Sequence, residues 1–209
     1  MFSRFSSEVG ADGVIALPPY VIKPNLNGLV DYYRAVAAAI DGPVFIQNFD
    51  PPLGSSLSPQ FIQKLLIDIP NISYVKEEMM PCGHSLSALI ETCGDELHGT
   101  FTGFSGRWFI NELNRGASGT MPACQFTDVM VTLYERFRAG DIEGAREMHT
   151  ALLPLVNIEN LYGVIFCKEI LKRRGIITTT YTRAPGRLDR HDHAEIDRLL
   201  QDVEGWFGG

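Results

Sequence analysis

The sequence predicts an α/β protein built on parallel strands and followed by an all-helical C-terminal part. Short apolar segments alternate with helical patterns five times in the first 124 residues, and the connections between them are short. That alternation is typical of a parallel sheet whose strands are joined by crossover helices. After Cys124 only helical patterns remain. We therefore expect a first domain over residues 1–124 and a helical subdomain over residues 125–209, with no linker between them.

The expected strands are short apolar runs bounded by residues that break regular structure. Pro18-Pro19 closes the first run, and Asp41-Gly42-Pro43 comes directly before the second. The third run starts after Pro70 and is broken by Pro81, whereas the second is closed by Pro51-Pro52. The runs are residues 10–20 (a turn and a strand), 44–48, 71–78, 96–103 and 116–122.

The expected helices follow apolar residues at helical spacing together with start and stop signals. Ser58-Pro59 combines an N-cap with proline at the first helical position, so a helix should run from Pro59 to about Asp68. Met1–Glu8 lacks a strong helix start signal. The other expected helices are residues 29–40, 85–92, 108–114, 126–139, 142–153, 158–174 and 193–204.

Composition and charge exclude several classes of protein. The chain is 45% hydrophobic and 21% charged, and it has no apolar run near the roughly 18 residues of a membrane span. Its net charge of −7 argues against the basic patch that non-specific nucleic-acid binding needs. Met1–Gly10 has no apolar core of a signal peptide. The four cysteines form no CxxC pair, so we expect reduced thiols in a cytoplasmic protein.

Lys76 is the strongest candidate for a catalytic residue. It stands at the carboxyl end of the third expected strand, after Tyr74 and Val75. An apolar surround disfavours the ammonium form, and a free lysine amine attacks carbonyl groups to form Schiff bases. Alternatively, Lys76 only marks where the strand reaches solvent. Glu77 or Glu78 could place a carboxylate beside an imine as a proton shuttle, or could be an ion-pair partner or a solvent-facing residue.

Other candidates have an equally plain alternative. The loop Gly103-Phe104-Ser105-Gly106 could donate backbone N–H groups to substrate oxygens, or be an ordinary turn. Met121 could face a pocket from the last strand, or fill the core. His191-Asp192-His193 resembles half of a metal site, but its polar context favours a solvated helix cap. Cys82-Gly83-His84 has no third ligand nearby, and we expect no metal site.

The order of short motifs along nearly the whole chain matches one enzyme family. The matching segments are Gly10-Ala11-Asp12-Gly13-Val14 with Pro19-Tyr20, then Val44–Asn48, Ser58-Pro59, Val75-Lys76-Glu77, Gly116-Ala117-Ser118-Gly119 and Ala139-Gly140-Asp141 with Ala145-Arg146. On these segments the chain resembles the dihydrodipicolinate synthase / N-acetylneuraminate lyase family of class I aldolases. The resemblance implies an eight-stranded (β/α) barrel with a helical C-terminal extension.

The same resemblance implies a site. The family's lysine forms an imine with the keto group of a 2-oxo acid, usually pyruvate, and its position here is Lys76. No cofactor is expected, and a homo-oligomer, either a tetramer or a dimer, is implied. The residues then expected to bind the substrate are Gln47, Asn48, Glu78, Gly103, Ser105, Gly106 and Met121.

The chain departs from the family in length. A complete barrel takes about 250 residues, whereas this sequence has 209 residues and five expected strands. The family's Gly-Thr-Thr-type loop, which binds the substrate carboxylate, has no equivalent here. We expect a partial barrel, either a fragment or the product of a misplaced start, with exposed apolar sheet edges. Expressed alone, it should be poorly soluble or oligomeric.

A second departure concerns the expected chemistry. Gln47-Asn48 stands where the family usually carries Tyr-Asn, and glutamine cannot act as a general acid or base. Together with Glu77-Glu78 and the loop Gly99–Gly103, this looks most like the sugar-acid branch. We therefore expect a Schiff-base lyase acting on a 2-keto-3-deoxy sugar acid such as 2-keto-3-deoxyarabonate. The alternatives are a pyruvate-condensing 4-hydroxy-tetrahydrodipicolinate synthase and a catalytically incompetent remnant.

Overall fold

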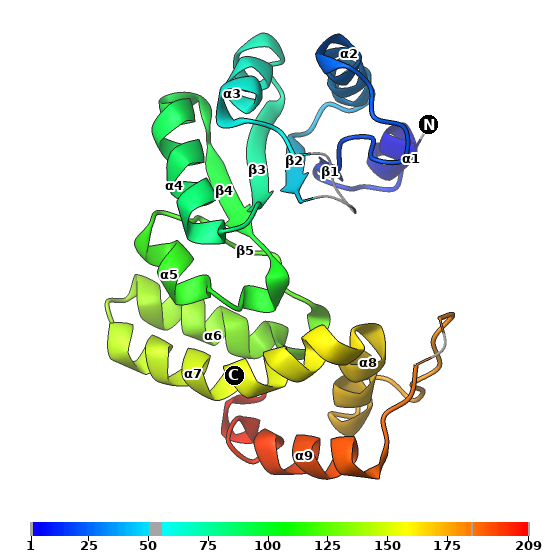
Figure 1. Cartoon of the computed structure of the whole chain (residues 1–209), viewed down its shortest axis with the longest axis vertical. Coiled ribbons are helices and arrows are strands. Elements are labelled where there is room, and N and C mark those ends of the chain that lie inside the picture. The colour runs from blue at the N-terminus through cyan, green and yellow to red at the C-terminus, as the bar shows by residue number, and fades with distance from the viewer. Residues whose placement is uncertain (1, 51–55, 185, 209) are drawn as a thin grey trace. The chain divides into compact units, whose positions relative to one another are not determined.

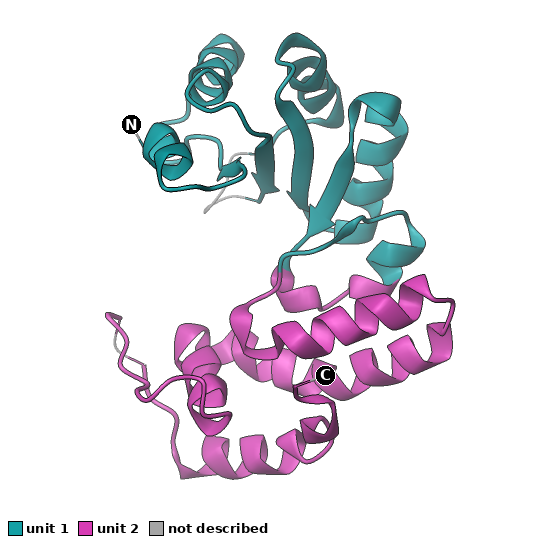
Figure 2. Cartoon of the chain, turned by 180° about the vertical axis from the view of Figure 1, so that it is seen from behind, with its two compact units in different colours: residues 1–103, 111–121 teal, residues 104–110, 122–209 magenta. Residues whose placement is uncertain are grey.

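The computed structural model describes residues 2–50, 56–184 and 186–208. Two compact units make up the chain, coloured separately in Figure 2. Unit 1 contains residues 1–103 and 111–121, and unit 2 contains residues 104–110 and 122–209. Compared with the expected division after residue 124, residues 104–110 and 122–124 lie with the second unit.

Unit 1 is organised around a five-stranded sheet in which every neighbouring pair is parallel. The strands follow one another across the sheet in chain order, β1-β2-β3-β4-β5, as Figure 1 shows. This confirms the parallel α/β class and the expected strand order. Several strands are shorter than expected, because only part of each apolar run is hydrogen-bonded to a neighbouring strand. The strands are β1 (Val14–Ala16), β2 (Val44–Phe49), β3 (Ile72–Glu78), β4 (Gly99–Thr102) and β5 (Gly119–Thr120).

Capping side chains fix the starts of two helices in unit 1. Ser58 accepts a bond from the Phe61 backbone N–H at 3.2 Å, and the helix it opens has the expected bounds. Asn25 caps the preceding helix, which therefore starts earlier than expected. Phe2–Glu8 is helical although the sequence has no strong start signal there. The helices are α1 (Phe2–Glu8), α2 (Leu26–Ala37), α3 (Pro59–Asp68) and α4 (Cys82–Cys93), and α5 (Phe109–Asn114) begins in residues of unit 2.

The core of unit 1 lies between the sheet and helices α2, α3 and α4, which are drawn on one side of the strands in Figure 1. Val44, Ile46 and Val75 point into it from the strands and are fully buried. Tyr33 from α2 is also fully buried, and its hydroxyl donates to the Ala16 carbonyl at 3.1 Å. The hydroxyl is thereby satisfied, so that the ring can be buried without an unpaired polar group.

A register shift in β3 decides which side chains face the helices. Val44 pairs with Ile72 but Phe45 pairs with Tyr74, so β3 has one extra residue, Ser73, at this point. From there on, side chains alternate between the two faces of the strand. Val75 joins the core on the helix side. Tyr74, Lys76 and Glu78 therefore share the opposite face, because a bulge of this kind re-aims the residues that follow it.

Unit 2 is helical in its larger part, as expected. Two expected helices, 142–153 and 158–174, have wrong bounds: α7 continues through Pro154, and Gly163, with a φ of 57°, separates it from α8. Asp189 caps the last helix with a capping box that includes Asp192, which agrees with a cap at this segment. The helices are α6 (Thr127–Arg138), α7 (Ile142–Tyr162), α8 (Val164–Arg173) and α9 (Arg190–Leu200).

Three further findings concern the described part of the chain. No helix there combines the length and apolar character needed to cross a membrane. No group of three or more His, Cys, Asp or Glu side chains within it could hold a metal ion. Its four cysteines are free thiols, of which only Cys124 is exposed. Pro51 and Pro52, which were expected to close the second strand, lie outside the described residues.

Candidate active site

Lys76, Gln47 and Glu78 meet on one face of the sheet. Gln47 on β2 lies directly opposite Lys76 on β3 in the parallel register. The Gln47 Nε2 atom donates to Glu78 Oε2 at 2.7 Å, and the Lys76 Nζ atom lies 3.4 Å from the same oxygen. Only 16% of the Lys76 side chain and 5% of the Glu78 side chain are exposed. One carboxylate oxygen therefore serves both an amide and an ammonium group, close to the carboxyl ends of two neighbouring strands.

Aromatic rings cover the same face one pleat before the cluster. The rings of Phe45 and Tyr74 are stacked with their centroids 4.6 Å apart, and the Phe101 ring lies 5.7 Å from that of Phe45. Phe101 also pairs with Lys76 in the β3–β4 register. The expected apolar surround of Lys76 is thus present on the strand side, whereas Glu78 supplies a counter-charge that was only one of the alternatives read from the sequence.

Gly103 makes room for the Glu78 carboxyl group. A Cβ atom at this position would lie 1.8 Å from Glu78 Oε1 and 2.5 Å from its carboxyl carbon. A side chain at that separation would force the Glu78 carboxyl group to move, so Gly103 acts on the site by allowing a close approach of backbone to carboxylate. The sequence placed Gly103 among the substrate-binding residues, and its contact with Glu78 is an additional reason why the position needs glycine.

Gly103→Ala is expected to lower turnover of the active protein on the order of 10²-fold, because a misplacement of about 1 Å has that effect on a reacting group. The added methyl group must push Glu78 away from Lys76 and Gln47. Steady-state kinetics of the purified variant measure this. Gly205→Ala is the matched control, since a Cβ there meets nothing within 4 Å. Unchanged turnover in Gly103→Ala would contradict the tight fit.

Asn48 and Glu77 lie on the opposite face of their strands and bond to each other. Asn48 Nδ2 donates to Glu77 Oε2 at 2.9 Å and to the Leu57 carbonyl at 3.1 Å, while Asn48 Oδ1 accepts from the Leu57 N–H at 2.8 Å. The Ser85 hydroxyl and the Met79 N–H donate to Glu77 Oε1 at 2.6 and 2.9 Å. The structure therefore does not bring Asn48 to the face of Lys76, and the pair ties β2, β3 and α4 together.

Burial raises the pKa of the Glu77 carboxyl group, and the bonds from Ser85, Asn48 and Met79 offset part of that rise. Asn48→Ala removes one of these bonds and leaves the buried Leu57 backbone groups unpaired. We expect it to lower the free energy of unfolding by about 1–3 kcal/mol. Chemical denaturation measures the change. Gln47→Ala is the control from the other face, where a smaller effect on stability is expected.

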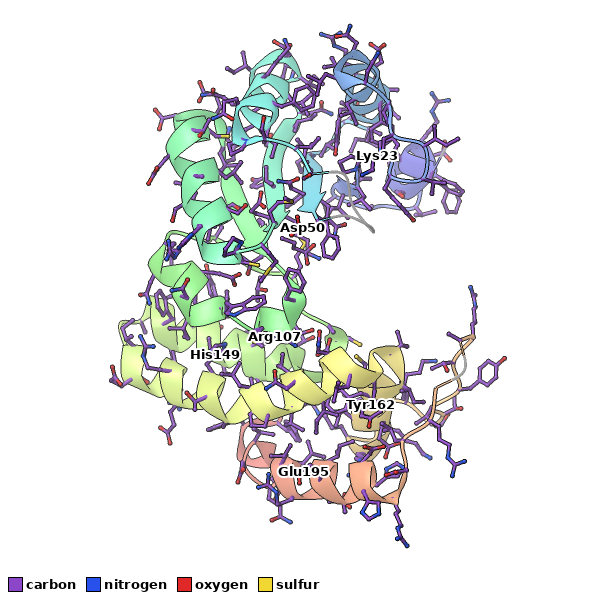
Figure 3. The ribbon with its side chains drawn as sticks, in the orientation of Figure 1. Lys23, Asp50, Arg107, His149, Tyr162 and Glu195 are labelled. Carbon is purple, nitrogen blue, oxygen red and sulfur yellow. The ribbon has the colours of Figure 1, made fainter. Side chains whose placement is uncertain are left out.

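Ser105 and Gly106 belong to unit 2, where their polar atoms are engaged. The Ser105 hydroxyl donates to a carboxylate oxygen of Glu159, and Gln125 Nε2 donates to the other at 2.6 Å. His149, labelled in Figure 3, donates from Nε2 to the Gly106 carbonyl at 2.8 Å, and burial lowers its pKa. Phe104 and Ser105 have φ values of 48° and 55°, so the turn holds two non-glycine residues in the left-handed region.

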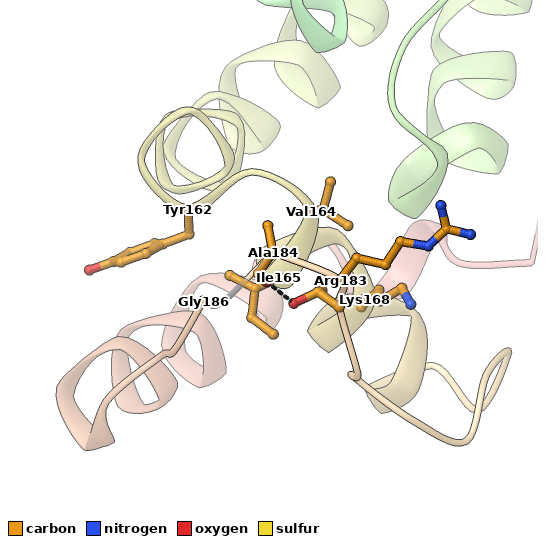
Figure 4. Close-up of a pocket in the computed structure, with 8 residues that line it drawn as sticks. Tyr162, Val164, Ile165, Lys168, Arg183, Ala184 and Gly186 are labelled. Atoms are coloured by element: carbon orange, nitrogen blue, oxygen red, sulfur yellow. Dashed lines mark hydrogen bonds between the residues drawn. The ribbon is translucent and has the colours of Figure 1, made fainter.

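Ser105 also lines a cavity of about 250 Å³ within unit 2. The other lining residues are Phe104, Arg107, Val156, Glu159 and Asn160. A larger cavity, of about 460 Å³, lies elsewhere in unit 2 between α8 and the segment after Tyr181, as the close-up in Figure 4 shows. None of the residues singled out from the sequence lines that second cavity, and it is not part of the candidate site. Met121 lies at the end of β5, where its N–H donates to the Thr102 carbonyl at 2.8 Å.

Glu112 is a buried acidic residue that the sequence reading missed. It lies on α5 and is 1% exposed. The available signal was an acidic residue among apolar neighbours, because Phe109, Ile110 and Leu113 on the same short helix are also buried. A charged residue within an apolar helix face is rare without a partner, but which partner it meets depends on tertiary contacts that sequence patterns do not contain.

Comparisons with known proteins agree on one family. The model of the dihydrodipicolinate synthetase family matches residues 2–203. An L-2-keto-3-deoxyarabonate dehydratase from Azospirillum brasilense is 29% identical over 184 residues, which is 86% of this chain and 59% of that protein. A 4-hydroxy-tetrahydrodipicolinate synthase from Methanospirillum hungatei is 34% identical over 156 residues, covering 74% of this chain and 52% of that protein. The chain thus spans between half and six-tenths of the length of these relatives.

A solved structure matches the fold. The crystal structure of dihydrodipicolinate synthase from Rhodopseudomonas palustris superposes with a TM-score of 0.83 at 28% sequence identity. The match covers 96% of this chain and 69% of that one. The chain therefore has the fold of part of that synthase.

Proposed function

This chain belongs to the dihydrodipicolinate synthetase family, and we propose that the whole protein is a Schiff-base lyase that dehydrates a 2-keto-3-deoxy sugar acid. One observation carries the proposal: the Lys76 amine and the Gln47 amide both meet one carboxylate oxygen of Glu78 on a single face of the sheet. A nucleophile, a proton acceptor and a group that orients the acceptor are thereby assembled on rigid strands.

Lys76 supplies the nucleophile. A proton passes from its ammonium group to Glu78, 3.4 Å away, and the freed Nζ bonds to C2 of the 2-oxo acid. The carbonyl oxygen leaves as water with one proton from the nitrogen and the one held by Glu78, which gives the protonated imine and restores the Glu78 carboxylate. The imine draws electrons from C3 and makes its C–H bonds acidic, which is the purpose of covalent catalysis by lysine.

Glu78 then moves the second proton. As a carboxylate on the face of Lys76, it accepts a proton from C3, and the electron pair of that C–H bond forms an enamine. The enamine expels the C4 hydroxyl group as water, with the proton that the leaving oxygen needs coming from Glu78. Hydrolysis of the remaining imine releases the product and restores the lysine. Each step balances without an external oxidant, reductant or cofactor.

Gln47 favours dehydration over condensation. Its amide donates to Glu78 and cannot exchange a proton with the substrate. Dehydration expels a hydroxyl group and needs no activation of a second carbonyl, whereas a condensation does. The similarity to the Azospirillum brasilense L-2-keto-3-deoxyarabonate dehydratase supports the same choice. A pyruvate-condensing synthase is the second candidate, supported by the 34% identity to the Methanospirillum hungatei enzyme.

The remaining residues have supporting roles in the proposal. Gly103 gives the Glu78 carboxylate its place, and Asn48 acts indirectly by holding the end of β3 through Glu77. Met121 follows the carboxyl end of β5 and is proposed to bind the substrate, and the same role is proposed for Ser105 and Gly106, which follow β4 in the chain. We further propose a homo-oligomer that uses no cofactor or metal. A cytoplasmic location is proposed as well, supported by free thiols at all four cysteines of the described chain.

Substrate profiling of the whole protein tests the proposal. Release of water from 2-keto-3-deoxyarabonate or a related sugar acid, with no condensation of pyruvate with aspartate semialdehyde, is the expected result. Robust condensation without dehydration would establish the second candidate. Absence of both activities in folded protein would favour an incompetent remnant.

A further inference from the structure

Glu112 is a buried carboxyl group that the proposed reaction does not use. It is 1% exposed, and no ion pair within the described residues includes it. Its Oε2 atom is buried and has no hydrogen-bond partner among those residues. An unpaired carboxylate in such a place is costly, so a buried group of this kind tends to hold a proton.

The groups that face Glu112 come from three elements. Thr102 lies at the end of β4, Glu78 at the end of β3, and Cys82 at the start of α4. Burial, and then the charge of Glu78, raise the pKa of Glu112 to about 7, while the Thr102 side chain lowers it in part. Burial and the carboxyl groups of Glu112, Glu77 and Glu78 raise the pKa of the Cys82 thiol to about 12. Cys82 therefore stays neutral. The charge that raises the pKa of Glu112 is that of Glu78.

The hydrogen bonds of three buried glutamates indicate which carboxyl group most readily holds a proton. Glu77, Glu78 and Glu112 are 2%, 4% and 1% exposed, and Lys76 is the ammonium group paired with this cluster. Glu77 accepts three hydrogen bonds, and Glu78 accepts from Gln47 and pairs with Lys76. Of the three, Glu112 has a fully buried oxygen, Oε2, with no hydrogen-bond partner among the described residues.

We propose that Glu112 is a positioning residue that holds a proton behind Glu78 and thereby sets the charge shared by Glu78 and Lys76. The proposal deepens the proposed function, on which its catalytic consequence rests. While Glu112 is neutral, Glu78 can remain ionised beside the lysine. When Glu112 ionises, its negative charge favours proton binding at both Glu78 and Lys76, because like charges repel and opposite charges attract. Imine formation, which needs the free amine, should then begin at higher pH.

Carboxyl NMR tests the coupling without any substrate. In protein labelled with ¹³C at the glutamate side-chain carboxyl, the Glu112 signal should titrate near pH 7, in line with its pKa of about 7. Glu112→Gln removes that signal and assigns it. Glu78→Gln should lower its midpoint by roughly half a unit or more, because a nearby like charge is removed. Glu91→Gln, at an exposed position on α4, should leave it unmoved.

Glu112 titration below pH 5, or a midpoint that ignores Glu78→Gln, would overturn the proposal. If Glu112→Gln does not fold, the Glu112 signal can be assigned sequentially in the wild type. The shift of its midpoint in Glu78→Gln then still tests the coupling. Stability offers a further check. Because the folded state holds this proton more tightly than the unfolded chain, stability should fall as pH rises from about 4.5 toward about 7. Glu112→Gln should lessen that fall.

The catalytic consequence is read from the pH dependence of imine formation. With borohydride and a 2-keto-3-deoxy acid, the Glu112→Gln variant should reach half-maximal trapping at a pH lower than wild type by roughly half a unit. A variant that merely loosens the fold would lower the yield without moving this midpoint. An unmoved midpoint would overturn the role for Glu112. If no adduct forms in either protein, the proposed function fails, while the carboxyl titration still decides whether Glu112 and Glu78 are coupled.

Discussion

Turnover is expected to disappear when Lys76 is replaced by arginine. The guanidinium group keeps a positive charge beside Glu78, so the ion pair at this position is retained. It cannot lose its proton in a protein and so cannot bond to a keto carbon. The measurement is the rate of sugar-acid consumption by the whole protein, followed over hours at high enzyme concentration.

Lys64→Arg is the matched control for that replacement. Lys64 lies on α3, its side chain is 57% exposed, and it pairs with Asp68 at 2.5 Å. Arginine keeps this surface pair as well, so turnover and stability should both stay at the wild-type level. Residual activity in Lys76→Arg above the level of an inactivated preparation would contradict a covalent role for the lysine.

Glu78→Gln is expected to lower turnover by roughly 10²–10⁴-fold, the usual contribution of a general acid or base. The amide keeps the size of the side chain but cannot accept the C3 proton. It also removes the counter-charge that holds the proton on Lys76, so solvent can take up that proton and imine formation itself should remain detectable. Single-turnover measurements separate the two steps, with adduct formation retained and release of water slowed.

Glu77→Gln distinguishes this chemistry from a general disturbance of β3. Glu77 lies on the opposite face and is held by Asn48, Ser85 and the Met79 N–H. Its replacement should lower the free energy of unfolding while the folded fraction keeps most of its turnover. Equal losses of turnover in the Glu77 and Glu78 variants would contradict the assignment of the proton transfer to Glu78.

Local signals were sufficient for much of the fold. Ser58-Pro59 defines the start of α3, and the apolar runs bounded by proline and glycine locate all five strands. The predicted helix bounds were wrong where contacts beyond the local sequence determine the end of a helix. Pro154 does not end α7, and the break comes instead at Gly163, which adopts a positive φ. The short helix at the N-terminus has no strong start signal.

The candidate site could be read only in part. Lys76 and Gln47 were both expected at the site, and the register of their consecutive strands places them opposite each other. Glu78 stands two residues after Lys76, so the alternation of a strand already places it on the face of the lysine. The bulge at Ser73, which no composition rule indicates, decides instead which face of β3 meets the helices. The surroundings of Glu112 could not be predicted, because they depend on how α5 packs against the ends of β3 and β4.

The central claim is that Lys76 forms a covalent imine with a 2-oxo acid. Borohydride reduction of the whole protein in the presence of pyruvate and of 2-keto-3-deoxy sugar acids, followed by peptide mass spectrometry, tests it most directly. We expect a stable adduct on the peptide that contains Lys76, and none in the Lys76→Arg protein. Absence of any adduct across the panel in folded whole protein, or an adduct confined to another lysine, would contradict the claim.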